Sequence, residues 1–118
     1  MIALLALLAL AAPGTTPGQA PGIRSEASFD VLVRTAADRM TQGDHEGAEL
    51  LLQQAIRQYP DRWVEPTYQR ANNLALQRRY AQARDVYLRI VGQAPVSHRA
   101  DDARFRVAEL TGVLGDPD

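Results

Sequence analysis

Apolar residues recur at helical spacing from residue 28 onward. In residues 28–42 they fall at offsets of three and four and so share one face of an α-helix: Phe29, Leu32, Val33, Ala36, Ala37 and Met40. Ser28 has a side-chain oxygen that can cap the start of this helix, and Gly43 follows its end. The pattern therefore predicts a helix over residues 28–42.

A second stretch, residues 44–59, has the same spacing. Its apolar positions are Ala48, Leu51, Leu52, Ala55, Ile56 and Tyr59. Asp44 is a suitable N-cap, and Pro60 forces the residue before it out of helical geometry. We expect a second helix here, joined to the first by a short turn at Gly43-Asp44.

The second stretch is repeated 35 residues later along the chain. A shift of that length carries Ala48 to Ala83, Leu52 to Tyr87, Ala55 to Ile90 and Pro60 to Pro95, and in the preceding helix it carries Ala36 to Ala71. Two unrelated amphipathic helices would share a phase more readily than they would share a terminal proline and the helix before it. We interpret the match as an internal repeat.

Three more helices complete the pattern, over residues 62–78, 80–93 and 97–112. Pro66 suits a first helical turn, and Ser97 can cap the last helix. The sequence thus predicts an all-α fold of five helices, arranged as antiparallel helix-hairpin repeats, with about two and a half repeats in the chain.

These helices resemble the tetratricopeptide repeat (TPR) family from residue 28 to about residue 112. The resemblance rests on Gly43-Asp44, Ala48, Leu52, Ala55 and Pro60, and again on Tyr80, Ala83, Tyr87, Ile90 and Pro95. At the second turn Arg78-Arg79 stands where the first has glycine and aspartate. The segment HRADDARFRVAEL, residues 98–110, is similar to repeats of bacterial cell-envelope TPR proteins. The resemblance implies a right-handed solenoid.

In arrays of this family, the first helix of each pair lines a concave groove that commonly binds a peptide. By position, the resemblance places six residues in the groove: Arg34, Ala37, Tyr68, Gln69, Asn72 and Arg104. The Asn72 amide lies among small and apolar neighbours and has the groups to donate to and accept from a peptide backbone. A role as an exposed amide, or in a helix-capping network, stays open for it.

The last helix has apolar residues beyond the face that packs on its neighbour. Ala100, Ala103, Val107 and Leu110 form one stripe, whereas Phe105 lies off it. We expect Phe105 to be partly exposed and to contact a partner protein or a second copy of the chain.

The first 27 residues have the character of a targeting segment and a linker. Residues 1–12, MIALLALLALAA, match the apolar core of a secretory signal, with cleavage before Ala12, and are too short to span a bilayer. Residues 13–27 are rich in proline and glycine, so the repeat domain is expected at 28–115. The segment predicts export, to the periplasm in a bacterium. An uncleaved membrane anchor, or a chance apolar start in a cytoplasmic protein, stays open.

Charge and composition exclude several classes of function. A net charge of −1 gives no field that would attract nucleic acid, and without cysteine there are no disulfides, thiol nucleophiles or cysteinyl metal sites. His98, Asp101 and Asp102 share a helix face and have side chains that can ligate a metal ion, but acidic residues in a first turn are explained by the helix dipole. The resemblance places His45 where TPR repeats have a packing aromatic residue, and Trp63 suits either the core or a contact surface.

No assembled catalytic motif is present in the sequence. We therefore expect a non-enzymatic module that binds a peptide or protein, with no cofactor and no metal. The alternative is a structural or capping subunit that self-associates through its last helix.

Overall fold

A computed structural model describes residues 26–115 of the 118-residue chain, with side chains from Ser28 onward. The chain divides into two units, residues 1–30 and 31–118, and the described part of the first is the beginning of a helix. The signal-like segment and most of the predicted linker lie outside the described residues.

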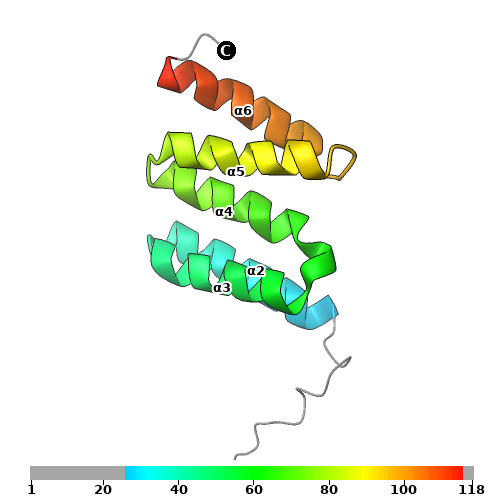
Figure 1. Cartoon of the computed structure of the whole chain (residues 1–118). Coiled ribbons are helices and arrows are strands. Elements are labelled where there is room, and N and C mark those ends of the chain that lie inside the picture. Colours follow the sequence, from blue (N-terminus) through cyan, green and yellow to red (C-terminus); the bar gives the residue numbers. More distant parts are fainter. Residues whose placement is uncertain (1–25, 116–118) are drawn as a thin grey trace, which may run out of the picture. The chain divides into compact units, whose positions relative to one another are not determined.

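All regular structure in the described range is helical, which confirms the predicted all-α class (Figure 1). The five helices are α2 (Glu26–Thr41), α3 (His45–Gln58), α4 (Val64–Leu76), α5 (Tyr80–Gln93) and α6 (Ala100–Leu114), and a short 3-10 helix, η3 (Pro60–Arg62), precedes α4. No helix in this range is both long and apolar enough to cross a bilayer.

The helices of the second unit pack in chain order. Helix α3 packs on α4, α4 on α5 and α5 on α6, and the four stand in that sequence in Figure 1. Short turns join them, so neighbouring helices run antiparallel. This packing is compatible with stacked helix hairpins.

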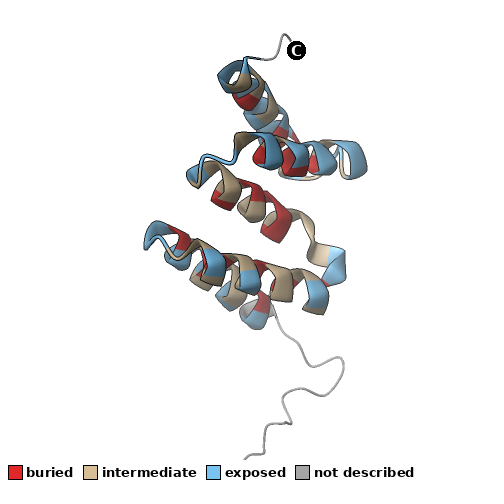
Figure 2. Cartoon of the chain, turned by 60° about the vertical axis from the view of Figure 1, so that its left-hand side comes forward, coloured by how far each residue is buried: buried red, intermediate tan, exposed pale blue. Residues whose placement is uncertain are grey.

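Two clusters of buried side chains hold the unit together. The larger joins α4, α5 and α6 and consists of Tyr68, Ala71, Ala83, Val86, Tyr87, Ile90, Ala103 and Leu110. The smaller joins α2 and α3 through Ala36, Met40, Ala48 and Leu52. Figure 2 shows the buried positions as stripes along the helices. Fully buried alanines in both clusters leave room for close helix approach.

The turn residues explain how each hairpin is closed. Gly43 has a φ of 84°, the left-handed conformation that glycine adopts without a steric cost. Asp44 caps α3 as predicted, because its Oδ1 accepts a hydrogen bond from the backbone N–H of Gly47 at 2.9 Å. Arg78, 35 residues after Gly43, has a φ of 62° and so has the same left-handed backbone conformation.

Two predicted helix starts are wrong. Helix α2 begins at Glu26, so Ser28 lies inside it rather than at its cap, in keeping with the good helix propensity of Glu26 and Ala27. Helix α6 begins at Ala100, because Ser97 Oγ donates to the carbonyl of Ala94 at 2.8 Å and closes a turn instead of capping a helix.

Three large apolar side chains, one before α4 and two on α6, differ in how far they are buried. Trp63, directly before α4, packs against the larger cluster, in agreement with a core role. Phe105 is 63% exposed, which confirms its predicted position off the packed stripe. Val113 is exposed to a similar extent on the same helix.

Candidate functional site

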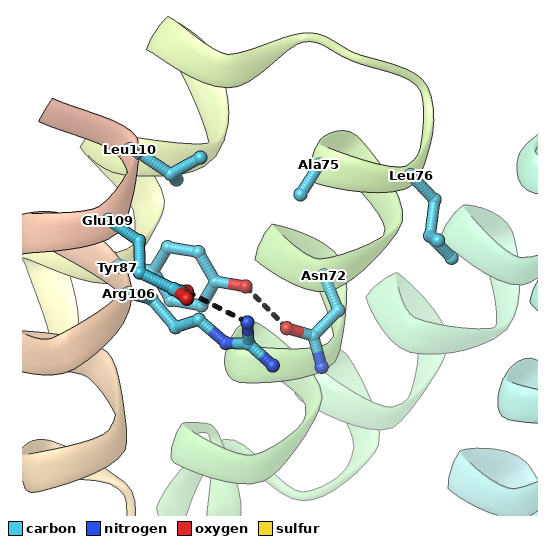
Figure 3. Close-up of a pocket in the computed structure, with 7 residues that line it drawn as sticks. All are labelled: Asn72, Ala75, Leu76, Tyr87, Arg106, Glu109 and Leu110. Carbon is cyan, nitrogen blue, oxygen red and sulfur yellow. Dashed lines mark hydrogen bonds and ion pairs between the residues drawn. The ribbon is translucent and has the colours of Figure 1, made fainter. Parts of the chain in front are cut away.

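A cavity of about 280 Å³ opens between α4 and α6, with a residue of α5 at its base (Figure 3). Helix α4 contributes Asn72, Ala75 and Leu76; α6 contributes Arg106, Glu109 and Leu110; and α5 contributes Tyr87. Because α4 and α6 flank α5, their facing sides leave a hollow over it. We call this hollow the α4–α6 pocket.

The polar part of the pocket is built around Asn72. The Tyr87 hydroxyl, at the base, donates to Asn72 Oδ1 (Figure 3). Asn72 Nδ2 in turn donates to Gln69 Oε1 at 3.3 Å, and Gln69 Nε2 donates to Glu65 Oε2 at 2.9 Å. Residues 65, 69 and 72 lie on one face of α4, so the bonds form a continuous chain along that helix. We call it the α4 hydrogen-bond chain.

The α4 hydrogen-bond chain ends at an ion pair between α4 and the turn before α6. Arg99 donates hydrogen bonds to both carboxylate oxygens of Glu65, from Nε to Oε1 at 2.8 Å and from Nη2 to Oε2 at 3.0 Å. Burial alone would raise the pKa of Glu65, but the hydrogen bonds from Arg99, Gln69 and His98 outweigh it and lower the pKa to about 2. Glu65 is therefore a carboxylate at neutral pH and can only accept hydrogen bonds.

Aromatic rings connect the ion pair back to the pocket. The Arg99 guanidinium lies 4.3 Å from the centroid of the Tyr68 ring, a cation–π arrangement. Tyr68 meets Tyr87 edge to face, with centroids 5.5 Å apart. Burial, with a smaller contribution from Tyr68, raises the pKa of Tyr87 to about 12, so its hydroxyl keeps its proton and acts as a donor.

The α6 wall of the pocket has one charge of each sign. Arg106 Nη1 donates to Glu109 Oε1 at 3.0 Å, and both side chains keep nearly half of their exposure. A side-chain hydrogen bond with Tyr68 raises the pKa of Arg106. Leu76, Ala75 and Leu110 form the apolar end of the same pocket, and Leu76 is 60% exposed.

The structure brings only one of the predicted groove residues into this pocket, namely Asn72. Gln69 is its neighbour in the α4 hydrogen-bond chain, and Tyr68 is 5% exposed and lies in the core. Arg34 is exposed and Ala37 is half-buried on α2, which does not line the pocket.

Arg104 lies on another face of α6. Its guanidinium binds Asp101 Oδ1 at 2.7 Å and the carbonyl of Pro95 at 3.0 Å, beside the turn that precedes α6. Two residues along a helix correspond to a rotation of about 200°, so Arg106 faces the pocket and Arg104 does not.

Six of the pocket's residues were not predicted from the sequence as site residues: Ala75, Leu76, Tyr87, Arg106, Glu109 and Leu110. A spacing in the sequence would have found two of them. Arg106 comes 34 residues after Asn72, and Leu110 comes 34 residues after Leu76. The pairs α2–α3 and α4–α5 match at a shift of 35 residues, so the change to 34 between α4 and α6 hides this relationship.

A second cavity, of about 360 Å³, lies between α3 and α4, and most of the residues that line it are polar. Asn73, which is 1% exposed, donates from Nδ2 to the carbonyl of His45 at 2.9 Å and holds His45 Nδ1 at 2.7 Å through Oδ1. His45 thus joins the two helices through a hydrogen bond rather than by apolar packing alone.

The three residues considered for a metal each bind a different partner. His98 Nε2 lies 3.0 Å from Glu65 Oε1, Asp101 pairs with Arg104, and Asp102 pairs with Arg99. Within residues 26–115 there is no group of three or more histidine, cysteine, aspartate or glutamate side chains that would hold a metal ion.

Comparison with known proteins adds no relative: the chain matches no protein-family model, no curated protein and no solved structure. The function is therefore inferred from the geometry and chemistry of the α4–α6 pocket.

Proposed function

We propose that the chain is a non-enzymatic, TPR-like interaction module that binds a peptide or protein partner in the α4–α6 pocket. The observation that carries this proposal is the pocket itself. It combines an amide held in place by Tyr87, a pair of opposite charges, and an exposed apolar residue, Leu76. Binding sites commonly combine an apolar surface with a few positioned polar groups of this kind.

The resemblance to TPR proteins supports the same proposal, because the pocket lies between α4 and α6, the first helices of successive pairs. The apolar start of the chain supports export to the cell envelope, and fractionation of cells that express the full chain tests this part. Recovery of an uncleaved chain in the cytoplasm would contradict it.

Self-association is a second candidate, favoured by the exposure of Phe105 and Val113 on α6. In this alternative α6 packs against α6 of a second copy, and no peptide is bound. The two candidates use different residues, so substitutions separate them.

The test uses two matched substitutions at exposed apolar residues, Leu76→Glu in the pocket and Phe105→Glu outside it. The full chain serves as bait in extracts of its native cells, and its own size is measured by light scattering over a range of concentrations. Peptide binding predicts that Leu76→Glu abolishes capture and Phe105→Glu does not. Capture that survives Leu76→Glu, or a dimer that only Phe105→Glu dissociates, would favour the alternative.

A further inference from the structure

The α4 hydrogen-bond chain has a direction. Glu65 is a carboxylate held by Arg99, so Gln69 must turn its NH₂ group towards Glu65 and its carbonyl oxygen towards Asn72. Asn72 must then turn its own NH₂ group towards Gln69, which leaves its oxygen to face Tyr87. Each amide has only one orientation that satisfies its neighbours, and the charge on Glu65 sets them all.

This direction determines what Asn72 can offer to a ligand. An amide nitrogen carries two hydrogens, and Gln69 takes one of them. The oxygen already accepts the hydroxyl proton of Tyr87. The Asn72 amide is therefore presented to the pocket mainly as a hydrogen-bond donor, and rotation by half a turn would place its oxygen against the Gln69 oxygen and break that bond.

The other walls specify the rest of the ligand. Arg106 and Glu109 neutralise each other at 3.0 Å, so the pocket has no net charge to favour an anion or a cation. Arg106 adds donors, and Glu109 adds an acceptor beside them. Ala75, Leu76 and Leu110 provide an apolar end, and the volume of about 280 Å³ suits one side chain with its flanking amides.

We propose that the α4 hydrogen-bond chain positions Asn72 as a donor, and that the pocket takes an uncharged internal stretch of peptide with one leucine-sized side chain. A backbone carbonyl of the peptide accepts from Asn72, a backbone N–H faces Glu109, and the side chain lies against Leu76 and Leu110. Gln69 and Tyr87 act as positioning residues. This inference rests on the proposed function, since it specifies the class of peptide that the same pocket would bind.

The probe is N-acetyl-L-leucine N-methylamide, which contains one leucine side chain between two amides. Titration into the ¹⁵N-labelled full chain is followed by NMR, and a ligand of this size is expected to bind in the millimolar range. One of the two Asn72 side-chain protons should shift to lower field and the other, held by Gln69, should move little. The matched alanine probe should bind about tenfold more weakly, since it buries less apolar surface.

Three variants test the roles of the residues. Asn72→Asp keeps the size and the acceptor but removes both N–H groups, and should weaken binding of the leucine probe at least about fivefold. Gln69→Leu interrupts the α4 hydrogen-bond chain and should weaken binding of the leucine probe about threefold. Because the Asn72 amide can then rotate, both of its side-chain protons should shift together. Leu76→Ala, at a residue already 60% exposed, should leave the fold intact and reduce the preference for leucine over alanine.

Gln53→Leu is the matched control. Gln53 Nε2 donates to Glu49 Oε2 at 2.8 Å, the same amide–carboxylate pair four residues apart, but on α3 and outside the pocket. This variant should bind the probe as the wild-type chain does. Thermal unfolding of every variant separates loss of binding from loss of fold, and Leu76→Ala provides the test if Asn72→Asp does not fold.

Several results would overturn the inference. These are the absence of saturable shifts, equal binding of the leucine and alanine probes, and wild-type binding by Asn72→Asp. Tighter binding of N-acetyl-L-leucine, which has a free carboxylate, would show that the pocket is an anion site instead. Partner capture that depends on Leu76 but not on Asn72 would leave the proposed function standing and remove this inference. Probe binding as predicted, with no captured partner, would do the reverse.

Discussion

The two helix pairs, α2–α3 and α4–α5, have the same order of helix, turn and helix but are stabilised by different chemistry. At equivalent positions 35 residues apart, Leu52 and Ala37 in the first pair correspond to Tyr87 and Asn72 in the second. Leu52 is fully buried in a small apolar cluster, whereas Tyr87 is buried with its hydroxyl bonded to Asn72. An apolar pair has thus been replaced by a hydrogen-bonded polar pair at the same place.

The turns of the two pairs differ in the same way. In the first, Asp44 N–H donates to the carbonyl of Arg39 at 2.8 Å, and in the second Arg79 N–H donates to that of Leu74 at 3.0 Å. The backbone is the same, yet the first turn has a glycine and a capping aspartate and the second has two arginines. The helix packing imposes this turn on residues that do not favour it.

The comparison teaches that two helix pairs can have the same helix order and turn geometry and yet be stabilised by interactions at different places. The first pair is stabilised by its turn. The second has a strained, uncapped turn, and its α4 is held instead by the Tyr68–Tyr87 contact with α5 and by the Glu65–Arg99 ion pair with the turn before α6. The hydrogen bonds that begin at Glu65 end at Asn72 and Tyr87, which line the pocket.

The largest loss of stability is expected when Tyr87 of α5 is replaced by leucine, the residue that α3 has at the equivalent position. Tyr87→Leu should destabilise the chain by about 3 kcal/mol, because it leaves a cavity and removes the donor for Asn72. Urea unfolding followed by circular dichroism measures this. Tyr87→Phe, which keeps the ring, should cost about 1 kcal/mol. If Tyr87→Leu cost no more than Tyr87→Phe, the ring would not be essential to the second core.

Acid should lower the stability of the fold, because it protonates Glu65 and so removes the ion pair with Arg99. The Glu65 pKa of about 2 when folded lies below the ordinary value of 4.5, so the unfolded chain binds more protons in between. The stability from Glu65 is present above pH 4.5 and is lost as pH falls towards 2. Because the side chain is 22% exposed, we expect a loss of about 2 kcal/mol, measured by urea unfolding at several pH values.

Glu65→Gln tests the origin of that acid loss. It should cost about 2 kcal/mol at neutral pH, since Arg99 is left without its carboxylate, and should flatten the pH dependence in this window. Asp101→Asn, which breaks a pair whose carboxylate is 98% exposed, serves as the control and should change little. An unchanged pH profile in Glu65→Gln would show that another group is responsible.

The two left-handed turn residues should respond differently to alanine. Gly43→Ala should destabilise by about 1 kcal/mol, because a Cβ is strained at a φ of 84° although no atom lies within 4 Å of it. Arg78→Ala should be nearly neutral, because arginine already has a Cβ at this position. Thermal midpoints of the two variants give the comparison directly. Equal losses at both residues would contradict the equivalence of the two turns.

The smallest effect is expected from giving the second turn the cap of the first. Arg79→Asp should stabilise by about 0.5–1 kcal/mol, because the carboxylate would cap α5 and meet the positive end of its dipole. A rise of a few degrees in the thermal midpoint would be the signature. A fall in the thermal midpoint would mean that the Arg79 side chain stabilises the fold although it is exposed.

Much of the helical layout could be predicted from the sequence, since it depends on local pattern. The spacing of apolar residues identified all five helices, and the cap at Asp44 was found because its partner, the N–H of Gly47, is three residues away. The start of α6 was misplaced for the opposite reason. Ser97 bonds back to Ala94, and Arg99 is held by Glu65, which lies 34 residues earlier in the chain.

By itself, then, the sequence determined the helices, their repeat and the small residues that let them approach, because each of these follows from neighbours a few positions apart. It also pointed to Asn72. Only the tertiary structure decided that Arg106 faces the pocket while Arg104 turns away, and that Asn72 is bonded to Tyr87. Those choices depend on how α6 is rotated against α5, which is set by the packing of Ala103 and Leu110 in the shared core.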